Sequence, residues 1–123
     1  MKKIERMKCK PCEGGVEPMK HDEVKSLLKD FANWRFIEGR MIKKEYTCRD
    51  FVSAIGLVNE IALIAENDGH HPDIKIHQWN KVTIQLWTHA IGGLSMNDFI
   101  LASKIDRITI NNNNIISKTY SRK

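Results

Sequence analysis

The sequence predicts an α+β domain in which a four-stranded antiparallel sheet carries three helices packed on one face. In three segments, apolar residues recur at three- and four-residue steps, as they do in helices with one buried face. In four others, short apolar runs or alternating apolar and polar residues indicate strands. The order is helix, two strands, long helix, two strands, helix. Strands joined by tight turns are antiparallel, and helices covering one face complete the fold.

The chain length of 123 residues suits one domain with its own core. Residues 1–20 contain turn-forming Pro and Gly and are predicted to be an N-terminal leader. Residues 21–110 are predicted to form the single domain, and the polar residues 111–123 a frayed tail.

The first helix is predicted over residues 21–32, where apolar residues share one face. Two strands follow, over residues 34–37 and 40–46, with a turn at 38–39. This pairing predicts a first hairpin of the sheet.

The longest helix is predicted to begin near Phe51, because apolar residues then recur with helical spacing up to residue 65. Thr47 is expected to cap its start, with Asp50 three residues later as a short capping box. Gly69 and Pro72 are expected to end it.

The last two strands are predicted over residues 74–79 and 82–89, with a turn at 80–81. The core-facing set of the second strand is Val82, Ile84, Leu86 and Thr88. Trp87 lies on the opposite face and is expected either to be exposed or to cover a subunit contact. Ser95 is expected to cap the last helix, with Asp98 in its first turn.

The formal net charge is +5 and the pI is about 9.2. A basic excess can indicate a nucleic-acid partner, but the lysines are spread along the chain, so we interpret it as a solvated surface. No stretch approaches the roughly 18 apolar residues of a membrane helix, and no apolar segment follows the charged N-terminus. The sequence therefore predicts a cytoplasmic protein that contacts neither nucleic acid nor membrane.

Cys9 and Cys12 form a C-x-x-C pair, which can bind a metal or carry out redox chemistry. A four-ligand zinc site needs a second pair, and a redox site sits between a strand and a helix. This pair lies in a Gly/Pro-rich segment and has no second pair, so a reduced, partly covered loop is the favoured interpretation.

Three of the five histidines, His70, His71 and His89, lie at the ends of predicted elements, where side chains can converge on a cleft. Glu66 lies one helical turn before His70, and Asp98 lies in the first turn of the last helix. Imidazole suits proton transfer near neutral pH. Removing hydroxide from a carbon beside a nitrogen needs an acid at the oxygen and a base elsewhere, and two or three imidazoles with a carboxylate supply both.

Each of these features also has a simpler interpretation. His70-His71-Pro72 is a polar turn in many proteins, His89 a strand-end residue, and Glu66 a solvated helix residue. Three histidines also make catalytic zinc sites, although adjacent histidines on extended chain diverge. His21 and His77 are interpreted as surface residues.

The full pattern resembles that of the pterin-4a-carbinolamine dehydratase family. The matching positions are Glu66, His70-His71-Pro72, Trp79, His89 and Asp98. The segments HHPDI, WNKV, THAIGGLS and NDFILASKID are also similar to the family, and the likeness runs from about Cys9 to Ile108. The spacing between Pro72 and Trp79 is one residue longer than in many members.

The resemblance implies a hydro-lyase, 4a-hydroxytetrahydrobiopterin dehydratase, that eliminates water to give quinonoid dihydropterin. It would recycle the pterin cofactor of an aromatic amino acid hydroxylase. It implies that His70 and His89 are the acid/base pair, either of which can protonate the leaving hydroxyl, and that His71 binds substrate. Glu66 and Asp98 would orient imidazoles.

By the same resemblance, Trp79 either walls the pocket or packs against its neighbours, and Pro72 helps to bind or orient the substrate. The resemblance implies no metal and no organic cofactor. It also implies that the protein assembles as a homodimer or homotetramer. The leader is similar to that of bacterial-type members. Two alternatives stay open: the same fold serving molybdopterin or folate-type pterin metabolism, or a non-enzymatic dimerisation cofactor of a transcription factor.

Overall fold

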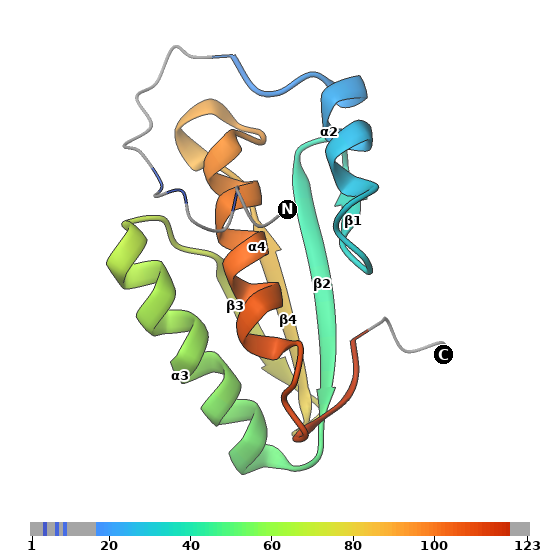
Figure 1. Cartoon of the computed structure of the whole chain (residues 1–123), viewed down its shortest axis with the longest axis vertical. Coiled ribbons are helices and arrows are strands. Elements are labelled where there is room, and N and C mark those ends of the chain that lie inside the picture. Colours follow the sequence, from blue (N-terminus) through green and yellow to red (C-terminus); the bar gives the residue numbers. More distant parts are fainter. Residues whose placement is uncertain (1–3, 5–6, 8, 10–16, 119–123) are drawn as a thin grey trace.

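A computed structural model of the chain describes residues 17–118 together with Ile4, Met7 and Cys9. Its main sheet has the strand order β1-β2-β4-β3, and every pairing is antiparallel. The strands are β1 (Arg35–Ile37), β2 (Met41–Cys48), β3 (Asp73–His77) and β4 (Lys81–Leu86). The helices are α2 (His21–Leu28), α3 (Phe51–Asp68) and α4 (Met96–Thr109). All three lie on one side of the sheet, which confirms the predicted α+β class (Figure 1).

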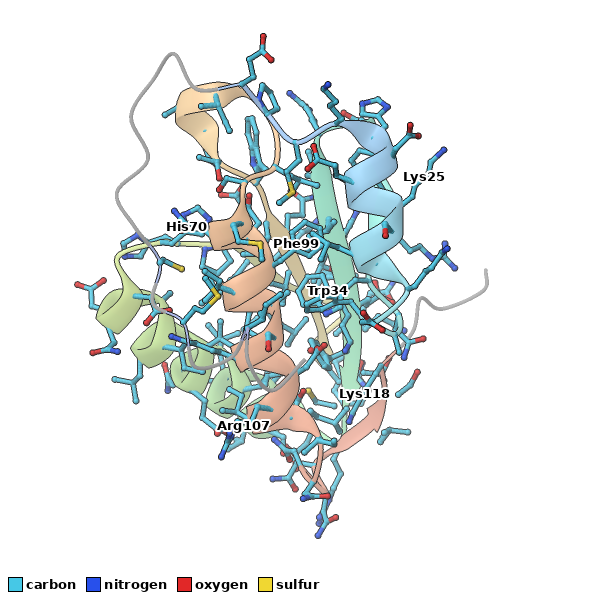
Figure 2. All side chains as sticks on the ribbon, turned by 45° about the horizontal axis from the view of Figure 1, so that its top comes forward. Lys25, Trp34, His70, Phe99, Arg107 and Lys118 are labelled. Carbon is cyan, nitrogen blue, oxygen red and sulfur yellow. The ribbon has the colours of Figure 1, made fainter. Side chains whose placement is uncertain are left out.

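The core fills the space between these helices and the sheet. The predicted inward set is buried: Val82, Ile84 and Leu86 lie on β4, and Thr88 lies just after it. Phe99 of α4 and Trp34, just before β1, are buried in the same layer, where Figure 2 labels them. The alternation of β4 therefore gives the sheet a helix-covered face and an opposite face, which we call the open face. No helix of the described residues is both long and apolar enough to cross a membrane.

The long helix α3 begins and ends where predicted, but its N-cap is not the predicted residue. Gly69 has a left-handed conformation (φ 68°) and ends the helix, as expected. Thr47 does not cap it, because β2 continues through Cys48 to pair with β4 and β5. The N-cap is Asp50, whose carboxylate accepts the N–H of Ser53 at 2.8 Å. This hydrogen bond holds the pKa of Asp50 below its ordinary value.

The prediction of a frayed tail is wrong for residues 115–117. They form strand β5 (Ile115–Ser117), which pairs antiparallel with the end of β2. Arg49 also donates its N–H to the carbonyl of Asn114 at 2.8 Å. Backbone pairing with a free strand edge offsets the polarity of this segment, which periodicity alone does not register. Residues 119–123 lie outside the described residues.

A buried ion pair ties β2 to α4. The Lys44 ammonium donates to Asp106 Oδ1 at 2.8 Å, and the indole N–H of Trp34 donates to the same oxygen at 3.0 Å. Lys44 is only 4% exposed. Removing its counterion would leave a buried charge without compensation.

We therefore expect Asp106→Ala to lower the free energy of unfolding by about 2 kcal/mol, less than for a fully buried pair because the Asp106 side chain is 30% exposed. Urea denaturation measures this loss. Lys44→Met combined with Asp106→Ala should recover most of it. Wild-type stability of the single variant would contradict the expectation.

Candidate active site

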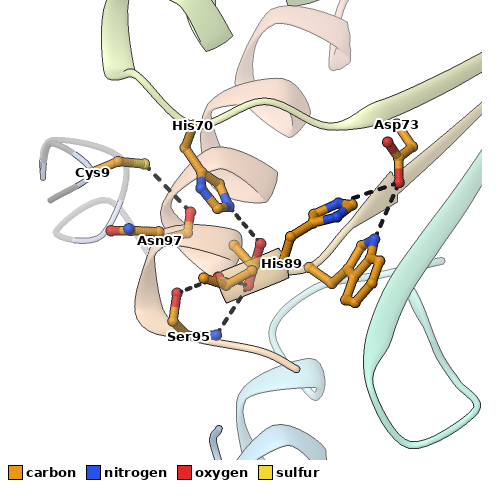
Figure 3. A network of polar contacts seen from close by, with 9 residues as sticks. Cys9, His70, Asp73, His89, Ser95 and Asn97 are labelled. Atoms are coloured by element: carbon orange, nitrogen blue, oxygen red, sulfur yellow. Dashed lines mark hydrogen bonds and ion pairs between the residues drawn. The ribbon is translucent and has the colours of Figure 1, made fainter. Parts of the chain in front are cut away.

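A hollow of about 400 Å³ lies at the edge of the sheet where β3 begins and β4 ends. Its lining residues are Gly69, His70, His71, Pro72, Asp73, Trp87, Thr88, His89 and Ala90. Two segments far apart in the sequence meet there, the turn after α3 and the segment after β4. Figure 3 shows His70 and His89 entering this region from these two segments.

His70 forms the buried half of the site. Its Nε2 lies 2.6 Å from Asp98 Oδ1, and the two side chains are 12% and 0% exposed. Gly69 positions His70, because the left-handed turn directs the chain from α3 toward the start of α4. The pair thus joins the C-terminal end of one helix to the N-terminal end of another.

The second oxygen of Asp98 is also occupied. Oδ2 accepts the Thr88 hydroxyl at 2.9 Å and the backbone N–H of Ser95 at 3.0 Å. Because Thr88 gives its proton to Asp98, the Ser95 hydroxyl donates to Thr88, 2.7 Å away. The predicted Ser95–Asp98 capping box is present, and the N-terminal end of α4 favours a negative charge at Asp98.

These contacts determine which ring nitrogen of His70 carries the proton. A carboxylate can only accept hydrogen bonds, so His70 Nε2 donates to Asp98. The proton of the neutral imidazole is therefore on Nε2, and Nδ1 is left as the acceptor. A histidine held this way can take up a proton from a bound molecule.

His89 forms the exposed half of the site. It opens the short 3₁₀ helix η1 (His89–Ile91) and is stacked on Trp87, with ring centroids 3.9 Å apart. Its Nε2 lies 3.6 Å from Asp73 Oδ2, and the indole N–H of Trp87 donates to that same oxygen at 3.1 Å. Asp73 and Trp87 together hold the position of the His89 ring. This differs from the prediction of a strand through His89, because β4 ends at Leu86.

The loop that carries His89 is closed at its base. Thr88 and Gly93 form an isolated bridge, with the Thr88 N–H 2.7 Å from the Gly93 carbonyl. A Cβ at Gly93 would lie 2.6 Å from Pro18 Cβ, so a larger residue would force this segment apart. This close packing holds the loop in place and so fixes the position of η1, which begins at His89.

His71 and Glu66 form a second, exposed pair. His71 Nε2 lies 2.9 Å from Glu66 Oε1, and their side chains are 62% and 82% exposed. The sequence suggested that Glu66 would serve His70, but the left-handed turn at Gly69 directs His71 back toward the helix instead. An ion pair this exposed adds little stability.

Trp79 does not reach the hollow. It lies in the turn between β3 and β4, at the opposite end of these strands, and is 61% exposed. The full length of β3 separates it from Asp73. Spacing in the sequence measures distance along the chain, and an extended strand carries the tryptophan away from the histidines.

Asp73, Trp87 and Thr88 line the hollow although sequence reasoning did not select them as site residues. Two features of the sequence could have pointed to these residues. Trp87 lies two residues before His89, and Asp73 follows His-His-Pro directly. Strand pairing between β3 and β4 then brings Asp73 beside both, which requires the register of the sheet.

The C-x-x-C pair is only partly described, since Cys12 lies outside the described residues. Cys9 is buried and its thiol lies 3.5 Å from the carbonyl of Asn97. Burial, helped by the negative charge of Asp68, raises the pKa of Cys9 to about 12. The thiol is therefore protonated at neutral pH, which gives no support to a nucleophilic or redox role. Among the described residues, no three His, Cys, Asp or Glu side chains are grouped so that they could hold a metal ion.

Comparisons with known proteins identify the family of the chain. The family described as "Pterin 4 alpha carbinolamine dehydratase" matches residues 17–108. A protein of Rickettsia bellii, provisionally named pterin-4-alpha-carbinolamine dehydratase, is 45% identical over 100 residues, which cover 80% of this chain and 88% of the relative. A protein of Nitrosospira multiformis with the same provisional name is 41% identical over 100 residues, covering 81% and 87%.

A solved structure from Brucella melitensis, described as a transcriptional coactivator/pterin dehydratase, superposes with a TM-score of 0.69. It is 29% identical and covers 75% of this chain and 98% of its own. The matched region contains every residue of the hollow. The chain therefore belongs to the pterin-4a-carbinolamine dehydratase family.

Proposed function

We propose that the protein is a dehydratase that eliminates water from a 4a-hydroxytetrahydropterin to give a quinonoid dihydropterin. One observation carries the proposal: two carboxylate-backed histidines, His70 with Asp98 and His89 with Asp73, line one hollow. The elimination needs one proton delivered and one removed, and two imidazoles in a shared cavity are suited to that task.

In the proposed reaction, the bond between C4a and its hydroxyl oxygen breaks while the lone pair of the adjacent ring nitrogen forms the new double bond. His89 gives a proton to the leaving oxygen, which departs as water. The Nδ1 atom of His70 removes a proton from the pterin ring. One proton enters and one leaves, so the reaction needs no oxidant, reductant or further reactant.

His89 is proposed as the acid because its exposed ring lies at the open side of the hollow, where Asp73, 3.6 Å away, holds its position. His70 suits the base role because its Nε2 proton is directed at Asp98. His71 and Pro72 form the rim of the hollow and are proposed to contact the substrate. Trp79 has no part in this proposal.

Cofactor recycling for an aromatic amino acid hydroxylase is the proposed cellular role, in the cytoplasm and as a homodimer or homotetramer. A role in molybdopterin or folate-type pterin metabolism is the alternative, because the same histidines would serve any such carbinolamine. The description of the Brucella protein also names a transcriptional coactivator. A non-enzymatic role of that kind is the second candidate.

The deciding experiment is dehydration of 4a-hydroxytetrahydropterin by the purified protein, followed by ultraviolet absorbance against the spontaneous reaction. We expect a clear acceleration that is first order in protein. No acceleration by folded protein would refute the dehydratase and leave the coactivator as the remaining candidate.

A further inference from the structure

The turn between β1 and β2 brings a cation to the edge of the active site. Arg40, the residue before β2, lies beside the end of β4, because Ile42 pairs with Leu86 in the sheet. The guanidinium carbon of Arg40 lies 5.0 Å from the centroid of the Trp87 ring, within the range of a cation–π contact. Arg40 is not among the residues that line the hollow, whereas Trp87 is. Arg40 therefore reaches the site through the indole.

The local backbone determines the position of Arg40. Glu38 and Gly39 both have left-handed conformations (φ 54° and 66°), as in the two-residue turns that suit an antiparallel hairpin. The N–H of Arg40 closes the turn by donating to the carbonyl of Ile37 at 3.1 Å. A Cβ at Gly39 would lie 3.1 Å from the ring of His21 on α2, so the turn also packs closely against that helix. The fold thus holds the backbone of Arg40 in place without help from its side chain.

The indole of Trp87 depends on this support because its other polar and stacking contacts are exposed. Its N–H donates to Asp73 at 3.1 Å, and its ring stacks on that of His89 with centroids 3.9 Å apart. The side chains of Asp73 and His89 are 54% and 59% exposed. Contacts at the surface are individually weak, so a third contact changes how much of the time the indole keeps this orientation.

The orientation of the indole in turn sets that of His89. The two rings are inclined by 34° to each other, so a rotated indole would either lose the stack or displace the imidazole. Asp73 joins the same arrangement, because the oxygen that accepts the indole N–H also lies 3.6 Å from His89 Nε2 (Figure 3). Proton transfer is sensitive to displacements of this kind, since donor and acceptor must lie within hydrogen-bond distance.

We infer that Arg40 is a positioning residue for the reaction: its guanidinium holds the Trp87 indole, and through it the His89 ring, in the orientation that delivers a proton into the hollow. This inference rests on the proposed function, since it takes His89 to be the acid. The ion pair of Arg40 with Glu38, at 3.2 Å, contributes little, because the two side chains are 46% and 65% exposed. The contact with Trp87 distinguishes Arg40 from an ordinary surface arginine.

Steady-state kinetics of dehydration by Arg40→Met tests the inference. Methionine keeps an aliphatic chain but removes the cation, so we expect kcat to fall about two- to fivefold, the factor that an exposed cation–π contact supplies, with little change in KM. Arg40→Lys keeps a cation and should recover most of the loss. Glu38→Gln is the matched control, because it removes the ion pair and keeps the contact with Trp87, and it should retain wild-type kcat.

Two further measurements separate this role from a merely structural one. In a double-mutant cycle, Arg40→Met should cause no further loss of kcat once Trp87→Leu has removed the indole. Proton NMR of the ligand-free protein gives a readout that does not depend on turnover. The ring current of the indole should shift the His89 ring protons upfield in the wild-type protein and in Arg40→Lys, and less so in Arg40→Met.

Wild-type kcat in Arg40→Met would overturn the inference, and so would an equal loss in the wild-type and Trp87→Leu backgrounds. An Arg40→Lys protein as slow as Arg40→Met would do the same, since it would show that the cation is not what matters. Absence of dehydration by the wild-type protein would refute the proposed reaction itself. An unchanged NMR shift of His89 in Arg40→Met would overturn the role of Arg40 whether or not the protein is a dehydratase.

Discussion

Replacing Asp98 with Asn is expected to lower kcat for pterin dehydration by a factor of about 100 to 10,000. Asp98 Oδ2 accepts from Thr88 and from the Ser95 N–H, so the amide oxygen of Asn must take that place. The amide NH₂ group then faces His70 Nε2, which has to accept rather than donate. The ring proton moves to Nδ1, and His70 can no longer act as a base.

This expectation has a direct spectroscopic readout. Nitrogen-15 NMR should place the neutral-ring proton of His70 on Nε2 in the wild-type protein and on Nδ1 in Asp98→Asn. Ser95→Ala is the control, because it removes the hydroxyl at Thr88 but keeps the backbone N–H that Asp98 accepts. It should lose about 1 kcal/mol of stability and keep most of its turnover. Undiminished kcat in a folded Asp98→Asn protein would remove the Asp98–His70 pair from the mechanism.

Replacing His89 with Ala is expected to lower kcat by a factor of about 100 while leaving the free energy of unfolding within about 0.5 kcal/mol of wild type. The ring is 59% exposed and contacts mainly Trp87 and Asp73, so little core packing is lost. The catalytic loss follows from the missing proton donor to the leaving hydroxyl. Steady-state kinetics and urea denaturation measure the two quantities separately.

His77→Ala is the matched control for this variant. His77 is also a partly exposed histidine on the open face, but it lies at the far end of β3 and contacts Thr83 and Glu45. It should keep wild-type kcat. A folded His89→Ala protein that turns over at the wild-type rate would show that His89 is not the acid.

Local sequence signals were enough to predict the α+β class, the order of the main helices and strands, and the candidate histidines. Hydrophobic periodicity is a local property, and it identified the long helix and the inward face of β4. The Ser95–Asp98 cap was identified by the residue types at a helix start, which are local as well. Gly69 marked the end of α3 correctly because its left-handed conformation is a property of that one residue. The family pattern added a hypothesis for the chemistry.

Which side chains meet could be read only from the folded chain. Asp98 serves His70, Glu66 meets His71, and Asp73 holds His89, while Trp79 lies at the other end of the sheet. These partnerships depend on strand register and on where each turn directs the chain, and both are set by packing between segments far apart in sequence. The pairing of β5 with β2 is decided in the same way, because a strand edge can recruit a polar segment that has no periodicity of its own.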